Sequence, residues 1–586
     1  MSNILVLNLP KGFDCILLHL NPGVLKRFKK ILKWFFLILL FLLVSIYIFI
    51  QTPFGQNWIV KQVTKRLSKD LQTKVTIAHV DFSLFNKMHL EGLMIEDRQG
   101  DTLLYAGDMK VRITDWFFFK KQAELKYVGL ENAVIKFQRT DSVWRQQFLF
   151  DYFGSSGGSG KKKEGGLKLD LRKLELKNVS FLKKDAWMGE DMQIKVGSLD
   201  LDADKLSLSG NRFEVNSLLI KDPVVAIYKY DRKKPRRIRT AEELEQEVKK
   251  ALGWNNQTIV KVGNLAIING TFSTDKEGKP RLDYFDGQHL LFTGINGKWN
   301  NARFEGDTVF ASMQLSAREK SGFEVKEMKA EVKMTPQGMA FSDLEIKTNR
   351  SVIRDYYSMS YDDMDDLGAY ISKVKMAAIF RDSYIDSDDI AFFAPKLANW
   401  KKKITLNGNV RGTVDNMIGT GMLIQAGNGT LFNGDLSMTG LPDINQTFID
   451  LRANDFRTVY PDMVTIIPAL QRVSSPDLRK IQYLNFKGNF TGFIRDFVTF
   501  GTVQTNLGTL VTDINMKLPA GQDPLYSGNI STENFRLGEF LGDRTIGAVA
   551  FDAIVKGRGF NDQSRNTSIE GKIKFAEIKG YRYRNI

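Results

Sequence analysis

The stretch Leu176-Lys-Asn-Val-Ser-Phe181 has a form that recurs along the first half of the chain. Each copy begins with an aliphatic residue, has Gly, Asn or Asp in the third place and has an apolar residue in the sixth place. The other copies are Leu90-Glu-Gly-Leu-Met-Ile95, Leu130-Glu-Asn-Ala-Val-Ile135, Ile220-Lys-Asp-Pro-Val-Val225 and Ile267-Ile-Asn-Gly-Thr-Phe272. Because Gly, Asn and Asp tolerate a positive φ, the third place predicts a bulge that redirects a strand. Recurrence every 40 to 47 residues is typical of stacked supersecondary units.

Apolar and charged residues alternate in the segments around these units. Residues 167–171 are one example, and residues 323–334 are another, with Lys and Glu between the apolar positions. A period of two predicts antiparallel strands with one apolar face and one wet face. The sequence therefore predicts a mainly β body.

The second half has a repeat of its own. Leu406-Asn-Gly-Asn-Val-Arg-Gly412 matches Phe486-Lys-Gly-Asn-Phe-Thr-Gly492, and a weaker copy begins at Val555-Lys-Gly-Arg-Gly559. Between the strands we expect a Gly/Ser loop at residues 154–166, a basic turn at 232–240 and short helices at 242–252, 389–397 and 459–470. These helices are too few to cover a long one-sided sheet. Its apolar face must close on itself, pair with a second sheet or hold lipid acyl chains.

Residues 31–50, ILKWFFLILLFLLVSIYIFI, contain one charge, Lys33, and are long enough to cross a membrane. They lack the small residues of a signal-peptide cleavage site, which favours an uncleaved signal-anchor. The basic residues Lys26, Arg27, Lys29 and Lys30 precede this run. They predict that the N-terminus stays in the cytoplasm and that the body lies on the other side of the membrane.

An amphipathic helix is expected directly after the anchor. Trp58, Ile59, Val63, Leu67 and Leu71 recur at helical spacing with Lys and Arg between them. We expect their face to pack against the body. The predicted organisation is a cytoplasmic segment at 1–30, a transmembrane signal-anchor at 31–51, the amphipathic helix at 56–72, β repeats at 75–320 and a continuation at 321–586 that looks truncated.

Composition narrows the class of protein. The formal net charge is +16, which permits attraction to anionic headgroups or acidic glycans. Nucleic acid is the least fitting partner for an exported chain. The single cysteine, Cys15, precedes the anchor, so the body has no disulfide and no thiol chemistry. This composition suits a bacterial periplasm.

Motifs for catalysis or metal binding are weak. The four histidines, His19, His79, His89 and His289, lack the spacing of a zinc site. The aspartates at 200, 202 and 204 imitate a calcium loop, but Lys205 stands where its glycine should be. The acidic run at 362–366 has no basic complement nearby. We therefore expect a protein that is not an enzyme and that has no catalytic residue, cofactor or metal.

At the anchor, the amphipathic helix, residues 75–90 (VTIAHVDFSLFNKMHL) and Asp101-Thr-Leu-Leu-Tyr-Ala-Gly107, the chain resembles the TamB family. This translocation and assembly module family is AsmA-like, and the likeness is greatest to members of the Bacteroidetes type. It extends from about Leu32 through the units to the Gly-rich repeats and rests on pattern and order.

The resemblance implies an elongated, repetitive β-solenoid, a taco-like trough with an apolar interior and a few short helices, in the periplasm behind a single-pass inner-membrane helix. It also implies a role in outer-membrane biogenesis. Family members are longer and end in a domain that meets an outer-membrane barrel of the BamA/TamA type, so this chain looks like an N-terminal portion.

The leading hypothesis is a conduit that binds phospholipid acyl chains along an apolar β-groove and leads them toward the outer membrane. The predicted groove-lining residues are Val325, Met328, Ala330, Val332 and Met334. The alternative is a non-enzymatic scaffold for the assembly of outer-membrane or secreted β-barrel proteins, in which exposed strand edges pair with client strands.

Overall fold

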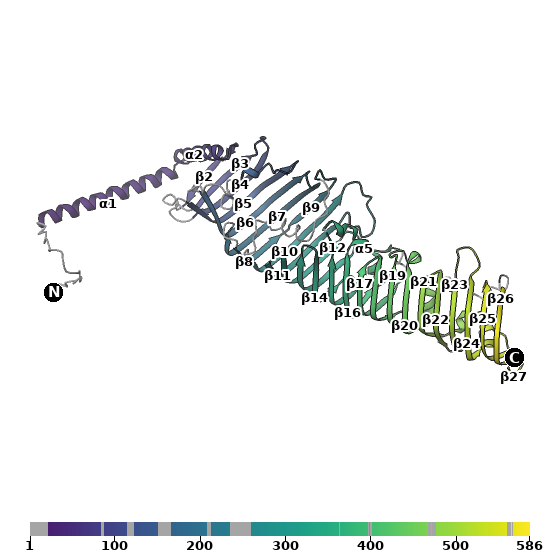
Figure 1. The fold of residues 1–586 in the computed structure, drawn as a ribbon. Helices are drawn as coiled ribbons and strands as arrows, with labels where there is room; N and C mark the ends of the chain where they lie inside the picture. Colours follow the sequence, from purple (N-terminus) through teal and green to yellow (C-terminus); the bar gives the residue numbers. More distant parts are fainter. Residues whose placement is uncertain are drawn as a thin grey trace, which may run out of the picture.

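The computed structural model describes residues 22–83, 87–113, 122–149, 166–207, 212–234, 259–362, 364–395, 398, 401–466, 470–471, 476–559, 564 and 566–585. Two helices come first, and a single long sheet follows them (Figure 1). The expected Gly/Ser loop and the helix at 242–252 lie outside the described residues, apart from Gly166, and so does most of the basic turn.

Helix α1 (Pro22–Gln51) contains the predicted anchor and begins earlier than expected. Among the described helices, it alone is long and apolar enough to cross a membrane, over residues 29–51. Helix α2 (Pro53–Leu71) begins three residues before the predicted start. The Thr52 side chain caps it by accepting the Gly55 N–H at 3.2 Å, and Pro53 occupies its first turn, where no N–H is needed.

The described strands form one sheet of 27 members. The first ten are β1 (Val75–Thr76), β2 (His79–Ser83), β3 (Lys87–Glu96), β4 (Thr102–Ile113), β5 (Gln122–Arg139), β6 (Gly166–Asp185), β7 (Glu190–Ser207), β8 (Arg212–Lys221), β9 (Val224–Lys229) and β10 (Ile259–Lys276). The middle strands are β11 (Leu291–Glu305), β12 (Thr308–Glu319), β13 (Glu324–Thr335), β14 (Gly338–Lys347), β15 (Val352–Ser360), β16 (Lys375–Asp386), β17 (Lys403–Thr413) and β18 (Asn416–Ala426). The last are β19 (Thr430–Thr439), β20 (Phe448–Val459), β21 (Tyr483–Phe493), β22 (Asp496–Thr505), β23 (Gly508–Lys517), β24 (Leu525–Arg536), β25 (Ile546–Arg558), β26 (Asn566–Ile578) and β27 (Tyr581–Arg584).

Most strands pair with their chain neighbours in antiparallel fashion, as alternation predicts. Two places differ: β5 pairs parallel to β6, and β10 pairs parallel to both β8 and β9. Strands β8 and β9 act as one strand broken at Asp222-Pro223, because both also pair with β7. Each parallel pair therefore needs a crossover connection, and the expected loop and basic turn fall in these two connections.

The positive φ predicted at the third place is confirmed, but the predicted bulge is found only beside Asn269, where the β10–β11 register shifts between Ile267 and Gly270. Every third-place residue has a left-handed φ. The values are 61° for Gly92, 52° for Asn132, 51° for Asn178, 50° for Asp222 and 55° for Asn269. At Gly92, Asn132, Asn178 and Asp222 the strand register is unshifted, so the left-handed residue kinks neighbouring strands at the same place without inserting a residue.

The repeat of the second half corresponds to four strands followed by a short helix. Helices α6 (Ser387–Ala391), α7 (Tyr460–Ile466) and α8 (Leu537–Leu541) follow β16, β20 and β24. The three Gly-rich copies lie on β17, β21 and β25, each the next strand after such a helix. Helix α6 ends earlier than predicted: Phe392 and Phe393 follow it and pack against Phe323 instead. The remaining short helices are α5 (Tyr370–Lys373), η2 (Met364–Ala369), η4 (Ile444–Gln446) and η6 (Leu478–Lys480).

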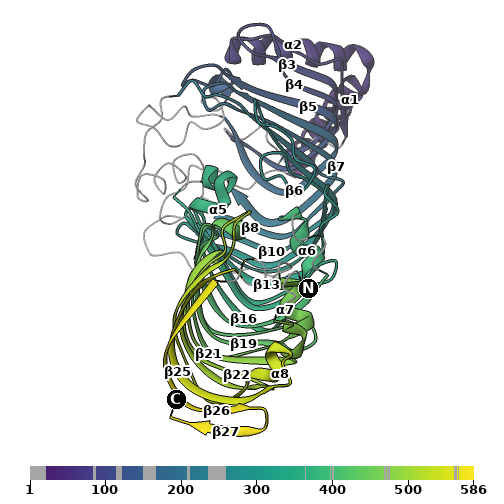
Figure 2. The same ribbon diagram turned by 90° about the vertical axis from the view of Figure 1, so that its right-hand side faces the viewer.

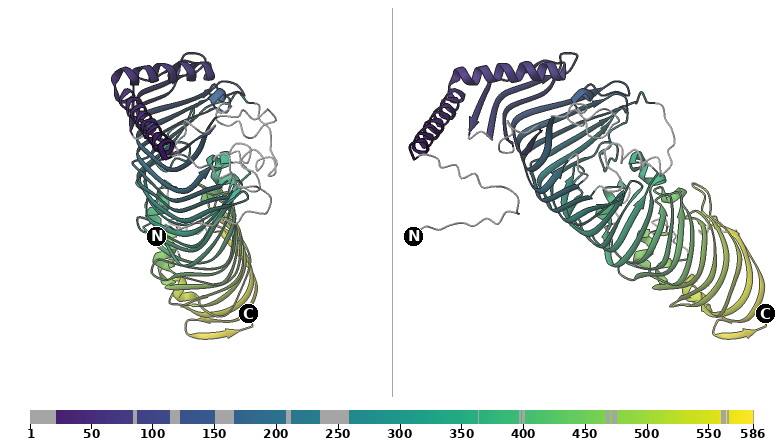
Figure 3. Two further views of the ribbon diagram at one scale, coloured as in Figure 1. Left: turned by 90° about the vertical axis from the view of Figure 1, so that its left-hand side faces the viewer. Right: turned by 60° about the vertical axis from the view of Figure 1, so that its left-hand side comes forward.

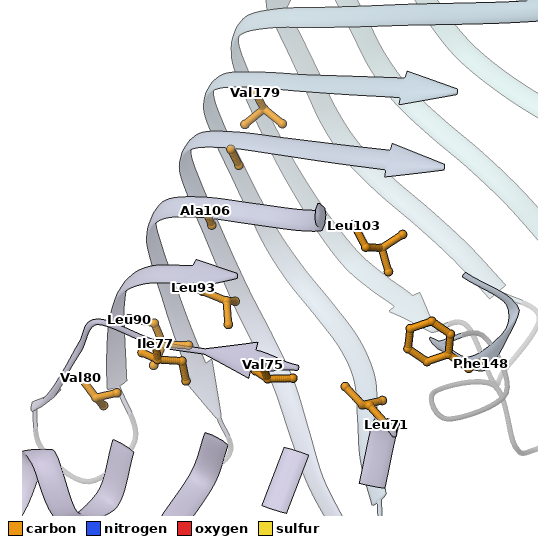
Figure 4. Packing of buried hydrophobic residues seen from close by; sticks show 11 residues of the cluster. Leu71, Val75, Ile77, Val80, Leu90, Leu93, Leu103, Ala106, Phe148 and Val179 are labelled. Carbon is orange, nitrogen blue, oxygen red and sulfur yellow. The ribbon is translucent and has the colours of Figure 1, made fainter. Parts of the chain in front are cut away.

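The sheet is bent across its strands into an elongated trough, with α6, α7 and α8 along one rim (Figure 2). Helix α2 closes the end that carries α1 (Figure 3). The predicted packing of its apolar side on the body is confirmed for Val63 and Leu67, which contact a core cluster that includes Leu71, Val75 and Leu90 (Figure 4). It is wrong for Trp58, which is 53% exposed because it lies on the opposite side of the helix. Within the described residues, strands contact their sheet neighbours and a few short helices, and no second sheet packs on them.

Candidate functional site

Cross-strand pairing arranges the recurrent units into continuous apolar rows. Residues paired on neighbouring strands lie on the same face of a sheet. The first-place residues of all five units fall in one row, with the partners that lie between them. The row is Val80, Leu90, Met109, Leu130, Leu176, Leu199, Ile220 and Ile267.

The sixth-place residues form a second row on the same face. It consists of Ile95, Leu104, Ile135, Phe181, Ile194, Val225, Phe272 and Phe292. A third row comes from alternate residues on the far side of the first. It consists of Met88, Val111, Val128, Leu174, Leu201, Leu218, Leu265, Trp299, Met313 and Ala330.

These rows line the inner side of the trough. In Figure 4, the first-row side chains Val80 and Leu90 lie on the same side of the curved strands as Leu93 and Val179, and all four belong to one buried cluster. Most row members farther along, such as Leu199 and Leu265, are only half-buried. The inner face is therefore an apolar lining that the described elements leave partly open.

The five residues predicted to line a groove lie on β13. Ala330 and Val332 are buried, and Met328 packs against them in one cluster with Phe341. Met334 lies on the same face and is 37% exposed. Val325 is an odd number of residues from Met328, so in a regular strand the two side chains would lie on opposite faces. A bulge between them pairs Val325 with Ala317, which lies on the same face as Leu315, the partner of Met328. The pairing brings all five to one face.

Met334 belongs to a row rich in methionine that the sequence did not reveal. Paired positions on β13 to β19 hold Met334, Met339, Met359, Met376, Gly412, Met417 and Met438. Methionine is unbranched and polarizable, so it adapts to ligands of variable shape. A further row continues the lining with Leu406, Ile424, Phe432, Phe456, Phe486, Val503 and Leu510.

The outer face is charged and wet. Lys177 pairs with Glu131 at 2.7 Å, and Glu327 lies 2.6 Å from Lys329 and 2.8 Å from Lys347. Hydrogen bonds from these two lysines lower the pKa of Glu327 to about 2. This alternation keeps one side of the sheet soluble while the other stays apolar.

An outer hollow of about 300 Å³ lies over β4 to β8 and is lined by charges of both signs. Tyr127 borders it and donates a 2.7 Å hydrogen bond to Glu175. Burial and this bond raise the pKa of Tyr127 to about 12, so the hydroxyl stays protonated. Leucines 130, 176, 199 and 219 also border the hollow, so its lining is mixed, with charged and apolar groups side by side.

The polar clusters of the described residues have structural partners. His89, Glu91 and Asp108 are close enough to share a cation, but His89 Nε2 already contacts Asp108 at 2.9 Å at the outer surface. The aspartates at 200, 202 and 204 are exposed on β7, as their alternation indicates. The expectation for the acidic run at 362–366 was wrong, because Lys373 Nζ contacts Asp366 Oδ1 at 2.7 Å.

Comparison with known proteins does not assign the chain to a family. No family model matches the chain, and no curated protein matches it. Sequence reasoning missed the rows on β2 to β10 as well as the methionine row. The signal for the first two rows was present in the sequence, because their members include the first and sixth places of the recurrent unit.

Proposed function

We propose that the chain is a non-enzymatic conduit for phospholipids in outer-membrane biogenesis. Helix α1 anchors it in a bacterial inner membrane, the N-terminus is cytoplasmic and the trough lies in the periplasm. Acyl chains lie along the inner face and are led toward the outer membrane. The proposal includes membership of the TamB family, which the sequence resembles.

The observation that carries this proposal is the continuity of the apolar lining. Apolar rows run from β2 to β23 with few interruptions, and the described elements place no second layer over them. Each CH₂ group that leaves water for such a lining gains about 0.8 kcal/mol. A single acyl chain spans about half of the ~30 Å hydrocarbon core, roughly 15 Å. At about 4.8 Å per strand, that length corresponds to about three strands, so the trough has room for several lipids in file.

The other two ways to bury the apolar face fit less well. A second sheet is absent from the described residues, and a filled solenoid would bury its lining, whereas Leu199, Leu265 and Met334 stay partly accessible. An extended client polypeptide would meet the same face. What the inner positions touch in the cell therefore separates the lipid conduit from the assembly scaffold.

Photo-crosslinking in living cells tests the proposal. A photoreactive amino acid replaces Leu199 or Met334 on the inner face of the full chain, and Ser198 or Lys333 serves as the matched outer neighbour. We expect lipid adducts at the two inner positions and not at the outer ones, as measured by mass spectrometry. Equal labelling of both faces, adducts with polypeptide alone, or no adduct at the inner positions would each overturn the conduit.

A further inference from the structure

Helix α2 has a second face that the core does not use. We define the outer face of α2 as Phe54, Trp58, Lys61, Lys65, Arg66 and Lys69. Phe54 and Trp58 are 73% and 53% exposed, and the basic members project from the same helix into solvent. They follow one another at mostly three or four residues and so share one side of the helix. The opposite side, with Val60, Val63 and Leu67, packs on the body.

The joint between the two helices determines where this face lies. Helix α2 does not continue α1 but turns across its end (Figure 3). The Thr52 hydroxyl donates to the Phe49 carbonyl at 2.7 Å and its oxygen accepts from Gly55, so the turn is capped from both sides. Gly55 permits the close approach, because a Cβ there would come 2.0 Å from the Phe49 carbonyl oxygen. The turn is therefore a built feature of the chain.

The order of residues along the outer face matches the layers of a membrane surface. Phe54 and Trp58 come within two turns of the end of α1, where a membrane-spanning helix leaves the hydrocarbon. Aromatic side chains favour that boundary, and basic side chains beside it favour anionic headgroups. Four cations follow them, and one acidic residue, Asp70, lies 3.8 Å from Arg66. The charge of the face remains strongly positive.

We infer that the outer face of α2 lies on the membrane surface and binds anionic phospholipid headgroups of the leaflet in which α1 ends. This rests on the proposed function, because it requires α1 to span the membrane. The contact clamps the membrane-proximal end of the trough at the lipid surface. Lipids that enter the trough there would come from a leaflet locally enriched in anionic species.

The test uses the full chain with Cys15→Ser and Gln62→Cys, because Gln62 is exposed between Trp58 and Arg66. An environment-sensitive fluorophore on this cysteine is quenched by lipids with a nitroxide on the headgroup. Vesicles contain phosphatidylcholine alone or with about 30% phosphatidylglycerol. We expect the quenching to be at least about two-fold stronger in the anionic vesicles. In 1 M salt, where the screening length is about 3 Å, the difference should disappear.

Matched variants isolate the charges of this face. The variant Lys61→Gln, Lys65→Gln, Arg66→Gln and Lys69→Gln should lose the anionic enhancement. The control variant Lys298→Gln, Lys333→Gln, Lys487→Gln and Lys572→Gln removes four charges from the body and should retain it. A fluorophore at Gln522, far along the trough, should show equal quenching in both kinds of vesicle.

The outcomes separate the two proposals. Release of the chain from vesicles by alkaline carbonate would overturn the anchor, and with it the proposed function. A chain that stays inserted but shows equal quenching with and without anionic lipid would overturn the headgroup contact alone. Loss of the enhancement in the body-charge control would also overturn it, because the effect would then come from net charge.

Discussion

The side-chain amide of Asn178 donates a 2.6 Å hydrogen bond to the side-chain oxygen of Asn132 on the neighbouring parallel strand. Both residues hold the third place of a recurrent unit, and both have a left-handed φ. Asn269 makes the same 2.6 Å contact to Asp222 at the other parallel pair. The third-place residues therefore supply the left-handed kink and also tie the kinks of adjacent strands together.

We expect Asn178→Val to loosen the β5–β6 pair. A β-branched residue at positive φ is strained, and the substitution also removes the amide bond, which together should cost about 1–2 kcal/mol. Long repeat proteins need not unfold as one unit, so a local probe is required. In a Cys15→Ser, Ala133→Cys chain, thiol labelling of the buried position 133 should accelerate about 5- to 30-fold. Asn178→Gly, which keeps the conformation accessible, should give a smaller increase.

A buried ion pair joins the C-terminal ends of the same two strands, β5 and β6. Arg139 donates to both Asp185 oxygens, at 2.7 and 2.8 Å, and stacks on Trp144 at 4.3 Å. Asp185 is 1% exposed. Although burial alone would raise the pKa of Asp185, the bonds from Arg139 and the Met188 N–H outweigh it and lower the pKa.

Asp185→Asn should therefore have a pH-dependent effect. Removing one partner of a buried pair costs about 3 kcal/mol, which corresponds to about 100-fold faster thiol labelling at position 133 of the Ala133→Cys chain at pH 7. Because the folded-state pKa is lowered, the contribution is complete above the ordinary value of about 3.9 and is lost as the pH falls through the lowered pKa. The variant and the parent chain should converge in acid, whereas the exposed control Asp200→Asn should match the parent at every pH. A constant difference across this range would contradict the assignment.

Much of the local structure follows from the sequence. Asn, Gly or Asp in the third place is enough to predict the positive φ, because few other residues tolerate it, but it does not predict whether the register shifts there. Alternation likewise predicts the apolar and wet faces. The register does not follow, since a strand with period two can pair with any neighbour of suitable length.

Two features of the site depend on that register. Val325 and Met328 are three residues apart, so they share a face only because β13 has a bulge between them. The six methionines from Met334 to Met438 each look like isolated core residues, and only the pairing of seven strands aligns them. The two parallel pairs are also non-local, since their strands are joined by long crossovers.

The joint between α1 and α2 gives a test of geometry. A Cβ on Gly55 would overlap the Phe49 carbonyl, so Gly55→Ala must shift one helix end against the other. We expect the distance between spin labels at positions 38 and 62 of a Cys15→Ser chain to change or broaden, as measured by pulsed electron resonance. Asn57→Ala, on the exposed side of the same turn, should leave the distance unchanged. If both variants behave alike, Gly55 does not fix the turn.

The last prediction separates conduction from binding. Val332 is 8% exposed, near the middle of the lining, and Val332→Asp places a carboxylate among the apolar side chains of its cluster. Burying this carboxylate, or moving an acyl chain past it, costs several kcal/mol unless the carboxylate is neutralised. If lipids travel from the α1 end, crosslinking to lipid at Leu199 should persist in this variant, while crosslinking at Phe486 on β21 should fall about ten-fold. Ser342→Asp adds the same charge on the outer face of the neighbouring strand, so it should leave both positions unchanged. Equal loss at both positions would instead indicate that the substitution unfolds the trough, and no loss at either would mean that lipids bind without passing along it.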